Sequence, residues 1–592
     1  MRISAGKSTF GALLTLVLVG VLLLTGCAAL PSTSAPQAIG VVQRDAGLAD
    51  VPTPTSGKEP DLLLRDFVKA SSEPGGRHSA ARKYLTGSAA VRWDDTVSIS
   101  IVEKIDVFFD SRTADSATLL VRAAKVGDLD DQGVFKAEEG TLETRVTMIR
   151  ENNEWRIDQL PDGVIVDRSQ FLNAYHEVAL YFLNRQGTVV VADPRWLSLR
   201  TDELAAQLID MLITGPKAPL AEAVSNKLGS DVHLRSTLTK LDGRDSDVGI
   251  GVGGVKMDFQ GIGSLGQANR RLLAAQVIWT LSSAGIAGPY EILADGAPLD
   301  ATHPEPLTTE DVAVFSSDTE SHSAGLLAIT DGTLVSVVES GAIPVPGALG
   351  QPSDLISASL SRGGDEVAGV RIADVPGERL LELVVGPFGG DAVPVASGGA
   401  ITRPTWSVGD NSVWAAIGGD KVVRAAKGSD GRWFSAPVDI REITELGGPI
   451  TEMRISGDGV RVALIVGGRV FIAYSTPLDD GSYRLSAPRA IGFSLGSSLI
   501  SLDWNGSQNL GVLRSGADNP LAQLSYDGFF VRPMTNRNLS PPLRAIDMTA
   551  SEAYVVDSRG VMRLSIPGTA DEQYWREVPG LMGNGAVPVT QG

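Results

Sequence analysis

The feature that most constrains how this chain folds is a repeat in its C-terminal half. An apolar run, a turn rich in Ser, Gly and Asp, and a returning run of Val and Ala recur at intervals of 46, 49, 49 and 44 residues. The equivalent turn positions are Ser361, Ser407, Ser456, Asn505 and Thr549. A repeat of 40 to 50 residues built from strand, turn and strand is typical of a β-propeller, in which each blade packs only on its neighbours.

The repeat sets the size of this propeller. The stretch from 311 to 338 can supply one more blade, so we predict about six blades over residues 308–582. A run of β-sandwiches is the alternative, because it also consists of short strands separated by turns. Trp406, Trp414 and Trp504 fall in these repeats, and two of them occupy the same repeat position. They could anchor a partner, but burial in the blade cores is the stronger prediction.

Composition supports a β-rich, folded chain of three to four domains. The 592 residues include 66 glycines, which indicate many turns, and 43% are hydrophobic, which excludes disorder as the main state. The net charge of -19 comes from 51 basic and 70 acidic residues. Such a chain is unsuited to general nucleic-acid binding, since that rests on Lys and Arg neutralising phosphates. It is equally unsuited to lying flat on anionic lipid.

The N-terminus predicts export. Arg2 and Lys7 precede an apolar run of 15 residues from Phe10 to Leu24. This run is shorter than the roughly 20 residues of a membrane span and suits a signal peptide, predicted over residues 1–26. The sequence Leu24-Thr25-Gly26-Cys27 then resembles the bacterial lipobox, which implies signal-peptidase recognition of Leu24, Thr25 and Gly26. The alternative is an uncleaved helix that carries an incidental cysteine.

Cys27 is the single cysteine of the chain. An intrachain disulfide and a cysteine-based zinc site are therefore excluded. The lipobox resemblance implies that its thiol carries diacylglycerol and that its amino group is acylated, for example with palmitate. Several acyl chains anchor a protein stably, so we expect attachment to the extracytoplasmic face of the cell membrane. Residues 27–60, which are rich in Pro, Ser, Thr, Ala and Gly, predict a flexible tether.

Residues 61–168 predict an α+β domain. Apolar residues around Leu62 to Val68 have helical spacing, and alternating runs such as 97–101, 117–121 and 142–149 predict strands. Helices that precede an antiparallel meander indicate one layer of helices on a curved sheet. This order resembles the NTF2-like and cystatin-like domains of cell-envelope lipoproteins.

Residues 169–300 predict a second α+β domain. We expect strands at 178–183, 188–191, 232–241, 255–259 and 290–293, with helices at 201–213 and 265–281. The run Leu180-Tyr181-Phe182, Asp193-Pro194-Arg195, Gly215-Pro216 and Val255-Lys256-Met257-Asp258-Phe259 resembles the GerMN domains of spore-germination proteins. That family is a binding module, so the resemblance implies no active site.

Two motifs have a ligand-binding pattern but the wrong context. The first motif has the spacing of an EF-hand calcium loop. Its oxygen-bearing side chains and its glycine are Asp128, Asp130, Gln132, Gly133 and Glu139. Its flanks predict strands, so an acidic hairpin is the better interpretation. The other is a pair of GxGxxG patterns, at Gly249, Gly251 and Gly254 and at Gly261, Gly263 and Gly266, with Glu291 as the ribose acid of the second. The GerMN-like elements already explain that segment.

Residues for catalysis are not evident from the sequence. The five histidines, His78, His176, His233, His303 and His322, show no HExxH spacing, and no G-x-S-x-G elbow is present. We therefore predict that the protein is not an enzyme and that it has no catalytic residues, cofactor or metal ion.

The full order of lipobox, tether, α+β domain, GerMN-like domain and propeller resembles the LpqB family of actinobacterial envelope lipoproteins. The resemblance implies an accessory role for the sensor kinase MtrB of the MtrA–MtrB two-component system, in envelope and cell-division homeostasis. Two alternatives stay open. A cell-wall glycan-binding or peptidoglycan-binding lipoprotein would show exposed aromatic platforms, and a propeller hydrolase would show carboxylates converging in the channel.

Overall fold

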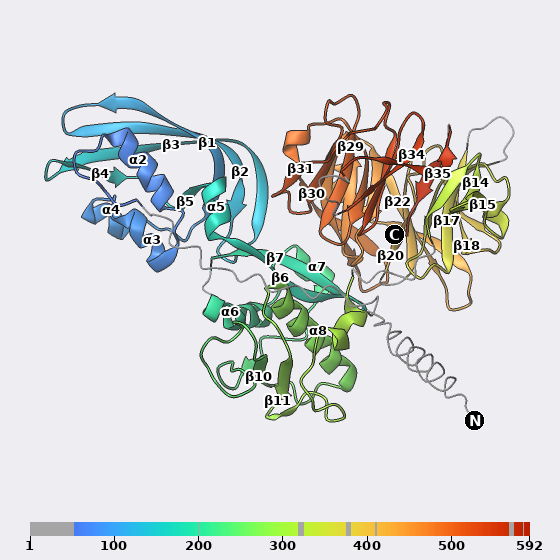
Figure 1. The fold of residues 1–592 in the computed structure, drawn as a ribbon, viewed down its shortest axis with the longest axis horizontal. Coiled ribbons are helices and arrows are strands. Elements are labelled where there is room, and N and C mark those ends of the chain that lie inside the picture. The colour runs from blue at the N-terminus through green and yellow to red at the C-terminus, as the bar shows by residue number, and fades with distance from the viewer. Residues whose placement is uncertain are drawn as a thin grey trace, which may run out of the picture. The chain divides into compact units, whose positions relative to one another are not determined.

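The computed structural model describes residues 52–198, 201–317, 325–373, 380–408, 411–566, 573–583 and 585–591 (Figure 1). The predicted signal peptide, the lipobox residues Leu24, Thr25, Gly26 and Cys27, and most of the tether lie outside these residues. The described part confirms the predicted fold class, with two α+β domains followed by an all-β propeller.

The first domain packs short helices on a five-stranded sheet. The helices are α2 (Pro60–Ala70), α3 (Gly75–Arg82) and α4 (Gly87–Arg92). The sheet has the order β4-β3-β2-β1-β5, with β1 (Ile99–Arg112), β2 (Ser116–Leu129), β3 (Phe135–Glu151), β4 (Glu154–Gln159) and β5 (Val164–Asp167). Leu63, Leu64 and Phe67 of α2 are buried because their spacing places them on one face of the helix. Helix α5 (Arg168–Ala174) belongs to the same core through Phe171, although it follows the predicted boundary at 168.

The second domain contains a βαβ unit and a smaller sheet. Strand β10 (Val255–Gln260), helix α8 (Gln267–Ser283) and parallel strand β11 (Tyr290–Ala294) form the unit, which β9 (His233–Leu234) and β12 (Ala297–Pro298) extend. The smaller sheet has the order β7-β6-β8, with β6 (His176–Asn184), β7 (Val190–Leu197) and β8 (Val224–Ser225). Helices α6 (Thr201–Thr214) and α7 (Leu220–Ala223) lie between β7 and β8 in sequence.

One predicted strand of this domain is much shorter in the structure. The expected strand at 232–241 forms only β9, and after it a single bridge joins Thr239 to Lys256. The chain then turns back, because the Lys240 amide donates to the carbonyl of Arg244.

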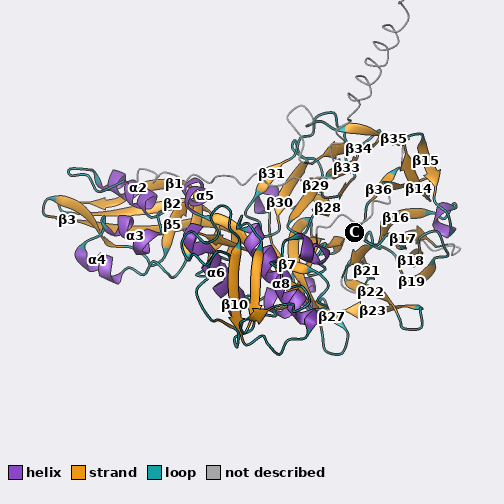
Figure 2. Cartoon of the chain, turned by 60° about the horizontal axis from the view of Figure 1, so that its bottom comes forward, coloured by secondary structure: helices purple, strands orange, loops and turns teal. Residues whose placement is uncertain are grey.

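Within the described residues, the propeller has six four-stranded blades, as predicted (Figure 2). Five blades consist of four consecutive strands each. The remaining blade combines β36, the last described strand, with the first three strands of the propeller, β13, β14 and β15. The strands are β13 (Leu327–Thr330), β14 (Thr333–Val338), β15 (Gly341–Pro344), β16 (Leu355–Leu360), β17 (Glu366–Ile372), β18 (Leu381–Pro387), β19 (Val393–Gly398), β20 (Thr405–Ser407), β21 (Ser412–Ile417), β22 (Lys421–Lys427), β23 (Trp433–Val438), β24 (Ile450–Ile455), β25 (Arg461–Val466), β26 (Arg469–Pro477), β27 (Tyr483–Ala490), β28 (Leu499–Asn505), β29 (Asn509–Arg514), β30 (Leu521–Ser525), β31 (Val531–Pro533), β32 (Ala545–Met548), β33 (Glu552–Val556), β34 (Gly560–Ser565), β35 (Arg576–Met582) and β36 (Val587–Val589).

Short helical turns accompany the strands, namely η1 (Glu310–Phe315), η2 (Ala348–Gly350), α9 (Arg441–Thr444) and η3 (Phe493–Leu495).

Strand β36 closes the propeller. It pairs antiparallel with β13, with Leu327 opposite Val589, and so completes the blade of β13, β14 and β15. This strand lies beyond the predicted range 308–582. The sequence repeat does not reveal it, because β36 is a single strand without the turn and returning strand that mark the other blades.

Three residues of the propeller belong to the cores of the α+β domains. Val460 and Tyr474 belong to the apolar core of the second domain. Phe529 belongs to the core of the first, where its ring lies 4.3 Å from Trp196 and 4.9 Å from Phe135 between ring centroids. The three domains therefore share apolar contacts within the described part of the chain.

Candidate functional site

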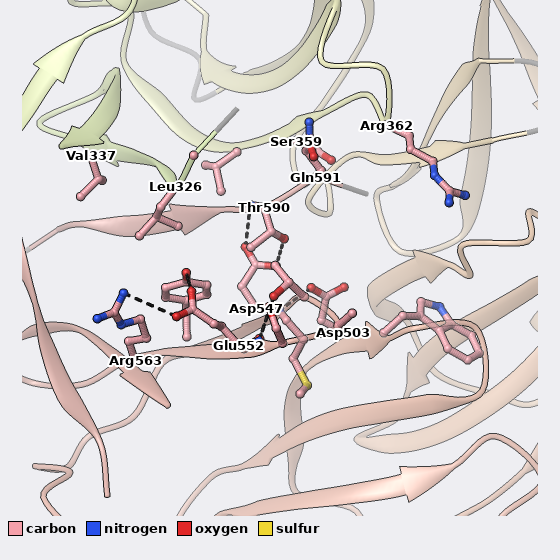
Figure 3. A pocket seen from close by; sticks show the side chains of 18 of the residues that line it. Leu326, Val337, Ser359, Arg362, Asp503, Asp547, Glu552, Arg563, Thr590 and Gln591 are labelled. Carbon is pink, nitrogen blue, oxygen red and sulfur yellow. Dashed lines mark hydrogen bonds and ion pairs between the residues drawn. The ribbon is translucent and has the colours of Figure 1, made fainter. Parts of the chain in front are cut away.

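The innermost strand of each blade alternates between apolar and polar residues. Side chains of successive residues point to opposite faces of a strand, so every second residue faces the propeller axis. The apolar positions pack in the blades, while Ser359, Thr405, Arg454, Asp503 and Asp547 occupy one equivalent position in five blades and line a cavity of about 730 Å³ (Figure 3). This cavity is the candidate site.

A cluster of buried charges lies at its inner end. The Arg403 guanidinium donates to Glu452 at 3.0 Å and to the backbone carbonyls of Leu502 and Ile546 at 3.0 and 3.2 Å. Its Nη1 also lies 3.4 Å from Asp547 Oδ1. Because Arg403 contacts groups from three other blades, it links their inner strands electrostatically.

The second arginine of the cluster is Arg454. Its Nη2 lies 3.4 Å from Glu452 Oε1 and its Nε lies 3.3 Å from Asp503 Oδ1. Its Nη1 also donates to the carbonyl of Pro404 at 3.1 Å. Two guanidinium groups thus contact three carboxyl groups in the channel, since Asp547 is paired with Arg403.

The two aspartates also accept hydrogen bonds from neighbouring strands. Asp503 Oδ2 accepts from the Met548 amide at 2.9 Å. Asp547 Oδ1 accepts from the Thr590 hydroxyl at 2.7 Å, and its Oδ2 accepts from the Thr590 amide at 3.3 Å. These bonds connect neighbouring blades, and the Thr590 pair ties down the residue after β36.

Burial changes the ionisation of this cluster. It raises the pKa of Asp503 well above its ordinary value, and the neighbouring Asp547 carboxyl raises it further. Burial likewise raises the pKa of Glu452, although Arg403 opposes the shift. Burial alone would lower the pKa of Arg403, but Glu452, Asp547 and Asp503 outweigh it and raise that pKa. The carboxyl groups converge as a hydrolase would require, but each is engaged by an arginine or by backbone amides.

The walls of the cavity differ in chemistry. One wall carries Leu326 and Val337, and Glu552 and Arg563 face them across the cavity (Figure 3). Arg563 Nη1 lies 3.5 Å from Glu552 Oε1, and the Tyr554 hydroxyl donates to Oε2 of the same carboxylate. Gln591 Nε2 is buried and has no hydrogen-bond partner among the described residues. The cavity thus offers an aliphatic surface and neutralised polar groups.

The tryptophans of the repeats lie in the blade cores, as predicted. Trp406, Trp414 and Trp504 are 1%, 0% and 6% exposed. Trp406 Nε1 donates to the Ser359 carbonyl and Trp504 Nε1 donates to the Arg454 carbonyl, both at 3.0 Å. Each bond therefore crosses to the inner strand of the preceding blade. The Trp406 and Trp504 indoles stabilise contacts between blades, and none of the three tryptophans offers an exposed platform.

The predicted acidic hairpin is the turn between β2 and β3. Lys125 Nζ lies 2.6 Å from Asp128 and 2.7 Å from Glu138, which places a cation among the acidic groups. Asp130 accepts from the amides of Gln132 and Val134 at 2.9 Å, so its carboxylate closes the turn. No group of His, Cys, Asp and Glu in the described residues has an arrangement that could hold a metal ion.

The second glycine pattern forms the loop between β10 and α8. Asp295 accepts from the amides of Gly261 and Gly263 at 3.2 and 2.8 Å, so a carboxylate of the protein already occupies these donors. Glu291 lies 3.0 Å from Lys256 Nζ instead of facing the loop. The structure therefore does not bring together a dinucleotide site here.

The histidines are scattered. His78 is buried beside Trp93, with ring centroids 6.1 Å apart, and burial lowers its pKa. His176 and His233 are exposed at the start of β6 and on β9. His303 lies 3.8 Å from Asp300, and His322 lies outside the described residues.

The channel charges are not among the predicted site residues, although the repeat contains a signal for them. Arg403 and Glu452 are separated by 49 residues, as are Arg454 and Asp503, and Asp547 follows Asp503 by 44. These are the intervals of the repeat itself. Charged side chains in register with a propeller repeat, two and four residues before its turn position, therefore indicate residues that face the axis.

Comparison with family models covers most of the chain. The model described as the N-terminal domain of lipoprotein LpqB matches residues 53–172. A model described as sporulation and spore germination matches 179–300, and the LpqB β-propeller domain matches 332–590. The fold and these matches define a three-domain lipoprotein that combines an α+β domain, a germination-type domain and a propeller.

Curated relatives extend the match to the full length. Lipoprotein LpqB of Rhodococcus opacus (strain B4) is 47% identical over 589 residues, which cover 99% of this chain and 98% of the relative. Lipoprotein LpqB of Mycobacterium tuberculosis (strain CDC 1551 / Oshkosh) is 39% identical over 586 residues, with 98% and 99% covered. The chain belongs to the LpqB family of lipoproteins, which makes it a membrane-associated lipoprotein.

The similarity to solved structures is low. The Cps50 (Swd1) β-propeller domain of Myceliophteria thermophila matches with a TM-score of 0.26 and 10% sequence identity. The match covers 37% of this chain and 67% of the matched chain. Puromycin hydrolase has a TM-score of 0.28 and 15% identity, with 45% of each chain covered. Scores of this size carry no argument about function. Within the described residues, no helix has the length and apolar character to cross a bilayer.

Proposed function

We propose that this lipoprotein is a non-catalytic accessory protein of a sensor kinase of the MtrB type. Acylated Cys27 would hold it on the extracytoplasmic face of the cell membrane, where it would bind the extracytoplasmic part of the kinase. Its role would then be to regulate MtrA–MtrB signalling in envelope and cell-division homeostasis. Full-length membership of the LpqB family is the observation that supports this proposal.

The channel chemistry supports a binding role over hydrolysis. A hydrolase needs a carboxylate free to act on substrate or water. Here Glu452 and Asp503 are both held by Arg454, and Asp547 is held by Thr590 and Arg403. A glycan-binding role gains no support from the repeat tryptophans, because all three are buried.

Regulation requires a difference in affinity between two states of the kinase. A bound protein shifts a conformational equilibrium only by as much as it binds one state better than the other. We therefore expect the kinase to change its autophosphorylation rate when the lipoprotein is added, and the ratio of affinities sets the size of that change.

Binding of purified proteins tests the proposal. Residues 28–592 would be titrated against the purified extracytoplasmic domain of the kinase, with the corresponding domain of an unrelated sensor kinase as the control. Saturable binding to the first domain alone is the expected result. Equal binding to both domains, or to neither at high concentration, would overturn the proposed partner.

A further inference from the structure

The cavity at the propeller axis has the size and the walls of a binding site. Its volume of about 730 Å³ lies within the range of ligand pockets. The lining combines aliphatic residues, including Leu326, Val337, Val578 and Pro579, with polar and charged side chains that make up about half of it. Its base is rigid because Asp547, Asp503 and Arg454 are held by bonds between blades.

The charges around the cavity favour an uncharged occupant. Glu552 is matched by Arg563 and Asp503 by Arg454, and Asp547 accepts from Thr590. At the rim, Arg362 donates to the carbonyls of Gly457 and Ser316 at 3.2 and 3.4 Å, and Glu339 is exposed to solvent. A charged group that reached the base of the cavity would have to break the buried Asp503–Arg454 pair, which is costly.

The polar groups that remain suit a peptide backbone. Gln591 Nε2 is a buried donor without an acceptor among the described residues, and an unmet buried donor costs free energy until a ligand supplies that acceptor. A peptide carbonyl is such an acceptor. A side-chain amide also has the same donor and acceptor pair as the peptide group that it would contact.

The apolar wall distinguishes a peptide from a saccharide. Sugar rings pack well on exposed aromatic faces, but the aromatic residues that line this cavity, Trp504 and Tyr554, are only 6% and 4% exposed. Leu326 and Val337 instead offer an aliphatic surface, which complements a Leu, Ile or Val side chain.

We propose that the cavity receives an uncharged peptide segment that carries an aliphatic side chain. This inference rests on the proposed function, because it takes the segment to belong to the extracytoplasmic domain of the sensor kinase. The channel end of the propeller would then be the docking surface.

Photo-crosslinking tests the location. A benzoylphenylalanine would replace Val337, which lines the cavity, in residues 28–592. In a matched protein it would replace Phe434, which is 51% exposed on the outer strand β23. After irradiation with the purified kinase domain, we expect a crosslink from position 337 and none from 434, and mass spectrometry should map it to an uncharged segment of the kinase.

Affinity measurements complete the test. Val337→Asp adds a charge to the aliphatic wall, and Ser551→Trp narrows the cavity from an exposed position, so the second variant keeps the test valid if the first fails to fold. Both should weaken binding of the kinase domain at least tenfold, whereas Phe434→Asp should leave it unchanged. Circular dichroism and melting curves would confirm that each variant is folded.

The outcomes separate this inference from the proposed function. If the kinase domain binds but neither variant weakens it and no crosslink forms at 337, the cavity is not the docking surface and the proposed function stands. If the kinase domain does not bind the unaltered protein, both are overturned. If chitobiose competes for the cavity and blocks labelling at 337, the occupant is a saccharide and the peptide is excluded.

Discussion

At the scale of single residues, Arg461 shows how one buried side chain joins two domains. It is fully buried, lies 2.6 Å from the equally buried Asp458, and donates to the Ala192 carbonyl on β7 of the second domain. Its guanidinium also lies over the ring of Tyr526, 4.1 Å from the centroid. A buried ion pair of this kind adds little to the free energy of unfolding compared with an apolar contact. Removing one partner lowers that free energy strongly, because the other charge stays buried without a counter-charge.

Arg461→Ala should therefore destabilise the protein by about 3 to 5 kcal/mol, because Asp458 would remain buried without its counter-charge. The double variant Arg461→Met with Asp458→Asn removes both charges and should cost less than the single variant. Denaturant unfolding of residues 28–592 measures both. Arg432→Ala, at an 88% exposed side chain, is the control that should change nothing. A double variant as unstable as Arg461→Ala would contradict the argument.

Asp503 predicts a dependence of stability on pH. Its folded pKa is raised by burial and by Asp547, whereas the unfolded carboxyl titrates near 3.9. Between these values the folded protein binds more protons than the unfolded chain, so its free energy of unfolding falls as the pH rises. Asp503→Asn should remove this decrease in the free energy of unfolding. In the unaltered protein the decrease amounts to at most about 1.4 kcal/mol per pH unit between the unfolded and folded pKa values of Asp503.

Unfolding curves at a series of pH values from 4 to 9 would measure this difference. Asp430→Asn, at an exposed turn, is the matched control and should follow the unaltered protein at every pH. The explanation fails if Asp503→Asn shows the same pH profile as the unaltered protein.

At the scale of elements, turns of the same Ser-x-Asp-Gly pattern position two of the side chains that contact the other domains. In Ser456-Gly457-Asp458-Gly459 the Asp458 carboxylate accepts from the Val460 amide, and in Ser525-Tyr526-Asp527-Gly528 the Asp527 carboxylate accepts from the Phe529 amide, both at 2.9 Å. Each glycine has positive φ, 76° and 83°, which is the conformation that the turn needs. The turns thereby fix the positions of Arg461 and Phe529.

Contacts between blades depend on the repeat tryptophans. Trp504→Phe keeps the apolar ring but leaves the Arg454 carbonyl without the indole donor, so we expect a loss of about 1 to 3 kcal/mol. Hydrogen exchange should increase in β24 as well as in β28, because the lost bond joins these strands. Trp414→Phe is the control: its indole donates to Ser412 within its own blade, so exchange should increase in that blade alone. Equal effects of the two variants would argue against a role between blades.

Local patterns explain why most elements could be predicted. The intervals between Ser361 and Thr549 follow from blades that each need four strands. Asn152 and Asn153 are residues of a type that tolerates positive φ, and they form a turn with φ of 52° and 65°. The pairing of β36 with β13 could not be read in this way, since it joins segments 260 residues apart. The contacts of Arg461 and Phe529 could not be predicted from the sequence either, because no neighbouring residue specifies their partners in another domain.

At the scale of the whole molecule, the predicted anchor governs where the propeller can act. Cys27→Ser should prevent acylation, because the serine hydroxyl cannot replace the thiol as acceptor of the diacylglycerol. We expect the variant to leave the membrane fraction or to keep its signal peptide, and intact mass with cell fractionation would show which occurs. Leu30→Ala, outside the lipobox, is the control. Unchanged membrane retention of a fully processed variant would contradict lipid anchoring through Cys27.

The closing strand of the propeller has a consequence for biosynthesis. Because β36 pairs with β13 only after some 260 intervening residues have been made, the ring stays open until β36 itself has been made. Long-range pairings of this kind are slow to form and leave strand edges exposed in the meantime. During the proposed export, the first blade would keep an unpaired edge on the outside of the membrane, and in this interval chaperones would protect the chain or proteases would remove it.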